Sequence, residues 1–134
     1  QCVGNYCGLR GNMCGGAQRH IDGNMCAPWV AVLDSLWRSR VLTTPRVREV
    51  LEGVDRRNYC AADSGCYDDA PQRIGFGITI SAPHMHARAL EELERKLTPG
   101  CHALDVGSGS GYLAVAMAKS TDLAHDPRDL ATAG

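Results

Sequence analysis

The sequence has little net charge and no long apolar run. Lys and Arg total 14 against 15 Asp and Glu, which gives a formal net charge of −1. Such a balance provides no bulk electrostatic attraction to nucleic acid or to a membrane surface. No apolar run approaches the roughly 18 residues of a membrane span, and no charged-then-apolar signal segment opens the chain. We therefore expect neither a nucleic-acid nor a membrane partner.

Cysteine, in contrast, is abundant, with 7 residues in the chain. The N-terminal ones show no C-x-x-C pair or other zinc-ligand spacing, so we expect no metal. A secreted disulfide framework stays open as an alternative, but reduced cytosolic cysteines are the favoured interpretation. The N-terminal group consists of Cys2, Cys7, Cys14 and Cys26.

Composition divides the chain into three segments. Residues 1–27 are rich in Gly, Asn and Cys without any period, and they predict a flexible leader. Residues 28–119 have the periodic patterns of an ordered domain. Residues 120–134, "STDLAHDPRDLATAG", predict an unrelated polar tail, and because the chain begins with Gln1, we expect a fragment or a processed product.

Three amphipathic helices are predicted before any glycine-rich motif. The first follows Pro28, with Val30, Leu33 and Trp37 at helical spacing. The second begins after Thr44 as a candidate N-cap, with Pro45 in its first turn. The buried stripe of the second helix is Val47, Val50, Leu51 and Val54.

The third helix follows a long loop at 58–77 and a short edge strand in "ITIS", residues 78–81. It spans 82–97, and Gly100 suits a left-handed residue after its end. We expect Glu91–Arg95 and Glu92–Lys96 to pair on its solvent side. The buried stripe consists of Leu90, Leu93 and Leu97.

"CHALDV", residues 101–106, predicts a buried strand, followed by a glycine turn and a helix over 112–119. Helices followed by a strand–Gly-loop–helix unit are typical of the start of a doubly wound α/β sheet. The fold class predicted is therefore α/β.

The turn "DVGSGSGYL" departs from the dinucleotide fingerprint G-x-G-x-x-G, since its glycines alternate at Gly107, Gly109 and Gly111. Asp105 would repel a pyrophosphate but suits a ligand with an ammonium group. S-adenosylmethionine has an ammonium group, a sulfonium and no phosphate. A glycine-rich turn without a ligand is the alternative.

Larger motifs extend this pattern: "VDRRNY", "TISAPHMHA" and "LDVGSGSGYL" occur in order between Trp29 and Lys119. Together they resemble the protein-L-isoaspartate (D-aspartate) O-methyltransferase family. The resemblance implies a Rossmann-like, S-adenosylmethionine-dependent methyltransferase fold without a metal. It also implies a monomeric repair enzyme that methylates the free carboxylate of L-isoaspartyl or D-aspartyl residues in damaged proteins.

The same resemblance implies the site residues. Ser81 corresponds to the active-site serine and His86 to the histidine near the cofactor, whereas a helix cap is the alternative for Ser81. A zinc pair of His84 with His86 is disfavoured, because i, i+2 side chains on a helix point apart. The remaining cofactor-binding candidates are Ile78, Thr79, Ile80, Asp105, Gly107, Ser108, Gly109 and Gly111.

The resemblance stops near Lys119, so we expect a domain truncated after its first strand–Gly-loop–helix unit. No apolar strand precedes Asp122, Asp126 or Asp129, and none of them is assigned the role of binding the ribose. Two other functions stay open: a non-catalytic form that binds isoaspartyl peptides or is inert, and a methyltransferase for small molecules.

Overall fold

The structure, a computed structural model, describes residues 27–61 and 64–123. Most of the predicted leader and the end of the predicted tail lie outside the described residues. None of the helices within these ranges is long and apolar enough to cross a membrane. The elements in chain order are α1 (Ala27–Arg38), α2 (Pro45–Glu52), a short 3-10 helix (Arg56–Tyr59), β1 (Gln72–Gly75), β2 (Ile78–Ile80), α3 (Pro83–Leu93) and α4 (Tyr112–Leu123).

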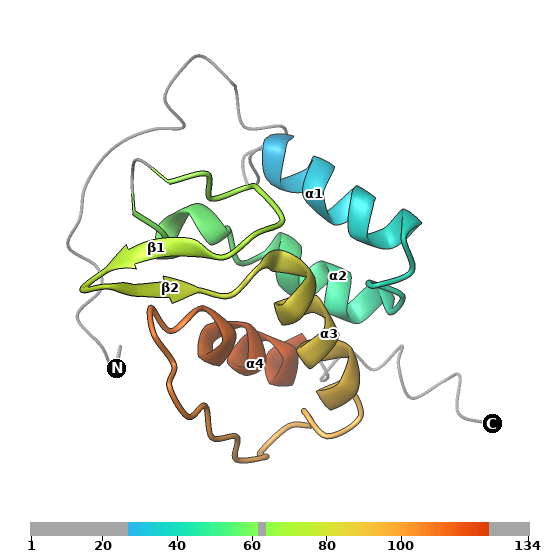
Figure 1. Cartoon of the computed structure of the whole chain (residues 1–134). Helices are drawn as coiled ribbons and strands as arrows, with labels where there is room; N and C mark the ends of the chain where they lie inside the picture. Colours follow the sequence, from blue (N-terminus) through green and yellow to red (C-terminus); the bar gives the residue numbers. More distant parts are fainter. Residues whose placement is uncertain (1–26, 62–63, 124–134) are drawn as a thin grey trace.

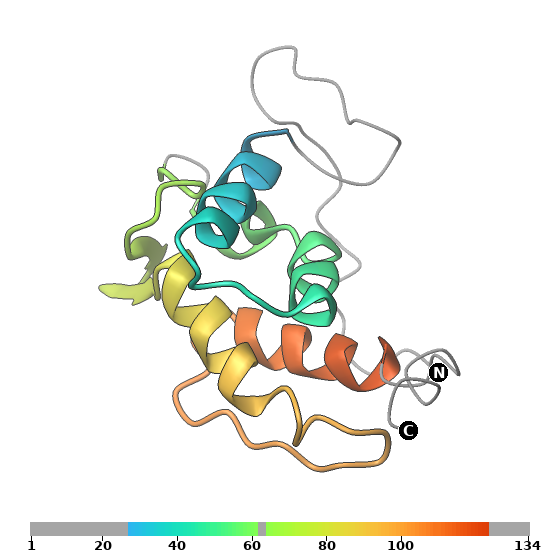
Figure 2. The same ribbon diagram turned by 90° about the vertical axis from the view of Figure 1, so that its right-hand side faces the viewer.

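Helix α2 is the centre of the helical core and packs against α1, α3 and α4. Figure 2 shows α3 and α4 side by side, with α1 and α2 on the side away from the loop that joins α3 to α4. The predicted stripe is confirmed, since Val47, Val50 and Leu51 are buried in α2 and Val54 is buried just beyond its end. Core residues from the four helices and their connections include Leu33, Leu42, Val50, Leu51, Leu90 and Ala116.

The first helix is rotated relative to its predicted face. It buries Trp29, Leu33 and Leu36, whereas Val30 and Trp37 are only partly buried. The indole Nε1 of Trp29 donates a hydrogen bond to the backbone oxygen of Leu51 at 2.8 Å. A buried indole N–H needs an acceptor, so this bond fixes the rotation of α1 about its axis. The spacing of apolar residues in the sequence does not predict this rotation.

Strands β1 and β2 form an antiparallel hairpin at one end of the helices (Figure 1). The strand predicted in "ITIS" is confirmed as β2, but its partner β1 lies in the segment expected to be a loop. The register pairs Arg73 with Thr79 and shifts between Arg73 and Gly75. Burial alternates along β1, but one of its two partly buried residues is the polar Gln72, so "QRIG" lacks the apolar–polar alternation that predicts a strand.

The predicted buried strand at 101–106 is wrong for this structure. The segment has no regular structure, and the side chains of Leu104 and Val106 are 86% and 85% exposed. A strand needs hydrogen-bonding neighbours, and among the described residues the only sheet is the β1–β2 hairpin. In Figure 1 the segment runs as a loop beside α4. Helix α4 itself continues to Leu123, beyond the predicted boundary at Lys119.

The end of α3 agrees with the sequence in one respect and differs in another. The helix ends at Leu93, four residues before the predicted boundary at Leu97, and its C-cap is Glu94. Gly100 has the left-handed φ of 77° that was predicted, but it lies in the connection beyond the helix and does not cap it. Glu91, however, does not face solvent opposite Arg95. Its carboxylate accepts hydrogen bonds from the backbone N–H and the hydroxyl of both Thr43 and Thr44, at 2.6–2.9 Å. The Thr44 hydroxyl therefore contacts α3 and makes no cap bond to α2.

We expect Glu91→Gln to destabilise the fold by about 1–2 kcal/mol, because charge-assisted bonds between α3 and the α1–α2 connection are lost. Partial burial raises the pKa of Glu91, but the hydrogen bonds from both threonines outweigh it and lower the pKa overall. Urea denaturation measures the difference. Glu92→Gln, on the exposed side of the same helix, is the control, and equal midpoints for the two variants would contradict the proposed link.

Candidate functional site

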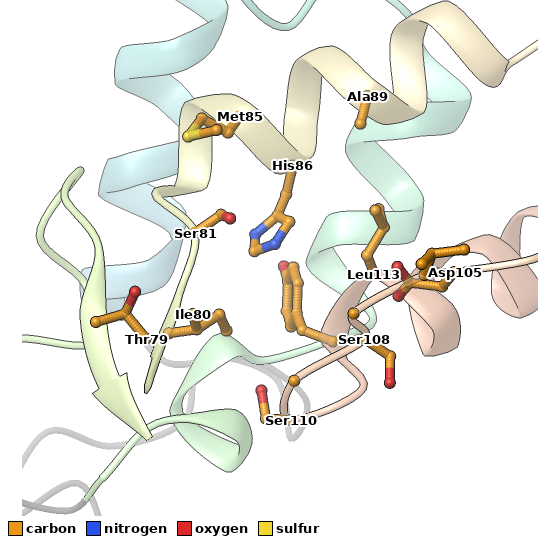
Figure 3. A pocket seen from close by; sticks show the side chains of 14 residues that line it. Thr79, Ile80, Ser81, Met85, His86, Ala89, Asp105, Ser108, Ser110 and Leu113 are labelled. Carbon is orange, nitrogen blue, oxygen red and sulfur yellow. The ribbon is translucent and has the colours of Figure 1, made fainter. Parts of the chain in front are cut away.

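A pocket of about 270 Å³ lies where three parts of the chain meet. They are β2 with the residues after it, the first half of α3, and the glycine turn that precedes α4. Figure 3 shows Thr79 and Ser81 on one side of the pocket and Asp105 on the other, with His86 projecting from α3 between them. The lining residues include Met85, Ala89, Ser110, Tyr112 and Leu113 in addition to residues named from the sequence.

The structure brings together every predicted site residue except two. Ile78 is 51% exposed and does not line the pocket. Gly111 lies just before α4 with φ of 82° and also stands outside the lining. The predicted residues that do line the pocket are Thr79, Ile80, Ser81, His86, Asp105, Gly107, Ser108 and Gly109.

The glycine turn depends on left-handed backbone conformations. Gly107 has φ of 79° and Gly109 has φ of 55°, a region where a side chain costs about 1–2 kcal/mol. A Cβ on Gly109 would also lie 3.3 Å from Cδ1 of Ile74. The backbone N–H of Gly111 donates to the oxygen of Ser108 at 2.8 Å, which closes the turn. The turn thus exposes main chain to the pocket.

Asp105 has an unpartnered oxygen. Its Oδ2 is buried and has no hydrogen-bond partner in the structure. Leaving a buried acceptor unsatisfied costs about 1–3 kcal/mol, and more when the group is charged. A ligand that donates hydrogen bonds or has a positive charge would satisfy this atom. The observation agrees with the prediction of an ammonium-bearing ligand beside Asp105.

Ser81 lies between β2 and α3 and is not the cap of the helix. The N-cap position of α3 belongs to Ala82, and α3 has no side-chain cap bond. Ser81 therefore does not act as a helix cap, which was the alternative to a role in the site. Its hydroxyl lies at the pocket, on the same side as Thr79 (Figure 3).

His86 is buried, with only 7% of its surface exposed. Its Nδ1 lies 3.3 Å from Nη1 of Arg56, and its ring centroid lies 4.7 Å from that of Tyr112 at an interplanar angle of 44°. Burial, and secondarily the charge of Arg56, lowers the pKa of His86 from 6.5 to about 4. The imidazole is therefore neutral at physiological pH.

His84, two residues earlier, has a separate environment. Its Nδ1 and its backbone N–H both lie 2.9 Å from Oδ1 of Asp69, on the exposed side of α3. In the part of the chain that the structure describes, no group of three or more His, Cys, Asp or Glu could hold a metal ion. The two histidines thus point to different surroundings.

Arg56 and Tyr112 were not predicted as parts of the site. Both belong to motifs quoted above. Arginines are usually exposed, and nothing in "VDRRNY" indicates that Arg56 is buried. Tyr112 occupies the third-glycine position of the dinucleotide pattern. Its side chain is 1% exposed, and its hydroxyl donates to the backbone oxygen of Val54 at 3.4 Å. Burial raises its pKa.

We expect acidification to destabilise the protein through His86. The unfolded state binds a proton near pH 6.5 and the folded state only near pH 4, so stability falls as the pH drops between these values. The total loss in the free energy of unfolding through His86 is on the order of 3 kcal/mol. Urea denaturation from pH 7 to pH 4 should show a smaller loss for His86→Gln than for the parent. His102→Gln, an exposed histidine, should behave like the parent, and identical profiles for all three proteins would refute this assignment.

Comparison with solved structures defines the class of protein. A Plasmodium falciparum protein described as a protein-L-isoaspartate O-methyltransferase, solved in complex with S-adenosyl-L-homocysteine, matches with a TM-score of 0.66 and 42% sequence identity. The match covers 71% of this chain and 43% of that chain. With helices before a glycine turn that opens α4, the described fold is part of a Rossmann-like methyltransferase fold.

Sequence comparison defines the family. The profile of the protein-L-isoaspartate(D-aspartate) O-methyltransferase (PCMT) family matches residues 29–124, so the chain belongs to this family. Protein-L-isoaspartate O-methyltransferases from Caenorhabditis elegans and Triticum aestivum are 51% and 49% identical over 87 and 88 residues. These alignments cover 65% and 66% of this chain but 38% of each relative. The chain therefore spans well under half the length of these relatives.

Proposed function

We propose that the protein is a protein-L-isoaspartate O-methyltransferase. It transfers a methyl group from S-adenosylmethionine to the free carboxylate of L-isoaspartyl and D-aspartyl residues in damaged proteins, which starts their repair. One observation supports this proposal most directly. In this chain, Asp105 has a buried carboxylate oxygen without a hydrogen-bond partner, and it lines the same pocket as Ser81.

The pocket residues fit the methyl donor. The unpartnered Oδ2 of Asp105 would accept from the ammonium of the methionine part, and the main chain from Gly107 to Gly109 would lie along it. When bound, S-adenosylmethionine supplies a methyl group activated by a sulfonium. Neutral His86 adds no positive charge beside this cation. The P. falciparum relative was solved with the product of such a donor, S-adenosyl-L-homocysteine.

The acceptor carboxylate needs no base, because carboxylates are ionised at neutral pH. Its oxygen bonds to the methyl carbon while the carbon–sulfur bond breaks, and the electron pair of that bond stays on sulfur. No proton moves in this step. The hydroxyl of Ser81 would donate to the acceptor and align it, and a fixed alignment of reacting groups can account for much of the rate. Ile80, 5% exposed, and Leu113 would help to exclude water from the pocket.

Other parts of the proposal rest on family membership and composition. We expect isoaspartyl-containing proteins and peptides as partners, a monomeric state and a cytoplasmic location. The net charge of −1 gives no reason to expect a nucleic-acid substrate.

Asp105 and Ser81 are expected to have separable effects. Asp105→Asn should weaken S-adenosylmethionine binding about 10- to 100-fold in calorimetry, because a charge-assisted hydrogen bond is lost. Ser81→Ala should leave that affinity within about threefold and instead weaken binding of an isoaspartyl peptide, because the hydroxyl that would donate to the acceptor is lost. Asp122→Asn, an exposed acid on α4, is the control. Donor affinity that survives Asp105→Asn intact would remove the main support for the donor site.

The 134-residue chain is expected to transfer methyl groups weakly or not at all, because the segment that positions Asp105 has no strand partner in the described structure. Transfer of a radiolabelled methyl group to an isoaspartyl peptide measures this, with the aspartyl peptide of the same sequence as control and the C. elegans relative as reference. Turnover close to that reference would show the expectation to be wrong. Equal labelling of both peptides would contradict the proposed substrate.

A further inference from the structure

Arg56 is buried and forms no salt bridge within the described residues. Its side chain is 0% exposed. Its Nε donates to the backbone oxygen of Cys66 at 2.8 Å, and its Nη2 donates to that of Ala70 at 3.4 Å. The third contact is Nη1 with Nδ1 of His86 at 3.3 Å. Within the described residues, no carboxylate forms a salt bridge with Arg56. Asp69 attracts the guanidinium without forming a salt bridge with it. Removing a guanidinium from water is expensive, so this arrangement requires an explanation.

The contact with Arg56 determines the tautomer of His86. A guanidinium has donors and no acceptor, so the Nδ1 of His86 must accept the hydrogen bond and lack a proton. In a neutral imidazole the proton then lies on Nε2. The ring of Tyr112, with its centroid 4.7 Å away, packs against the imidazole and restricts its orientation. The His86 side chain therefore has one hydrogen-bond donor, Nε2–H, and the residue lines the pocket.

We propose that Arg56 is a positioning residue that holds His86 as the neutral Nε2–H tautomer, so that the pocket offers a polarised donor to an anionic oxygen. The chain of groups is a fixed positive charge, a neutral imidazole and a carboxylate. A hydrogen bond on one side of a polarisable group strengthens the donor on the other side. This inference rests on the proposed function, in which the anionic oxygen belongs to the isoaspartyl carboxylate.

The arrangement gives the pocket opposite charges on its two sides. The unpartnered carboxylate of Asp105 lies on one side (Figure 3), and Arg56 lies behind His86. This polarity suits a cationic donor beside Asp105 and an anionic acceptor beside His86. A protonated histidine would place a second cation next to the sulfonium, whereas Arg56 acts through a neutral ring. The buried charge thus orients the two reactants.

The tautomer is measured directly by long-range ¹H–¹⁵N correlation on the full chain labelled with ¹⁵N-histidine. At pH 7 we expect the His86 ring to show a protonated Nε2 and an unprotonated Nδ1. A protonated Nδ1, or an imidazolium at this pH, would overturn the proposal. This measurement requires neither methyl transfer nor a bound ligand, so it stands apart from the proposed function.

Arg56→Met tests the link between the two residues, with Arg88→Met as the control, an exposed arginine on the same helix as His86. In folded Arg56→Met, verified by circular dichroism, we expect a mixture of tautomers. Calorimetry should show isoaspartyl peptide affinity reduced about 10- to 100-fold and S-adenosylmethionine affinity within about threefold. A folded variant that retained the Nε2–H tautomer and full peptide affinity would contradict the proposal.

A second pair of variants keeps Arg56 in place, so the test survives if Arg56→Met fails to fold. The amide nitrogen of Gln reaches the position of Nε2 in histidine, whereas the shorter Asn reaches only that of Nδ1. His86→Gln should therefore retain at least about fivefold more peptide affinity than His86→Asn. Equal losses would count against the donor role. Absence of peptide binding by the parent chain would contradict the proposed function and leave the tautomer measurement decisive for Arg56.

Discussion

The structure around the pocket depends on one buried cation, the guanidinium of Arg56. Its three contacts hold the backbone at Cys66, the backbone at Ala70 and the ring of His86 on α3. The first two lie in the connection between the 3-10 helix and β1, so this single group joins an irregular segment to a helix. Since an unsatisfied buried guanidinium would cost several kcal/mol, each of these partners is kept close to its observed position.

This constraint explains why an irregular segment can form one wall of a pocket. The loop before β1 contains no regular strand or helix, and the main-chain oxygens of Cys66 and Ala70 accept hydrogen bonds from the guanidinium. Hydrogen bonds to a charged donor are stronger than those between neutral groups. Burial lowers the pKa of Arg56, although the guanidinium stays charged because its ordinary pKa is so high. The loop, β2 and α3 thus keep Ser81 and His86 at fixed places relative to each other.

Much of this architecture was predictable from sequence, but only where the signal is local. Helix α2 was predicted with its buried stripe because four apolar residues recur at helical spacing after a Thr-Pro start. The glycine turn was predicted because only glycine adopts its left-handed conformations readily. The rotation of α1, the partner strand β1 and the bonds of Glu91 depend on contacts between residues distant in sequence, such as Glu91 with Thr43. The role of Arg56 follows from its burial. The sequence, with two adjacent arginines, does not indicate which of them is buried.

The segment 101–106 contains a predicted site residue that lines the pocket, but the predicted strand around it does not form. Its apolar residues match a central strand, yet Leu104 is exposed and a second pocket of about 320 Å³ separates the segment from α4, lined by Cys101, Ala103 and Met117. Apolar side chains that face water favour a packed alternative when one is available. Asp105 lines both pockets, so any contact that drew this segment into a sheet would also fix the carboxylate that we assign to the methyl donor. Pairing of this strand and donor binding should therefore stabilise each other, because both act on the same short stretch of backbone.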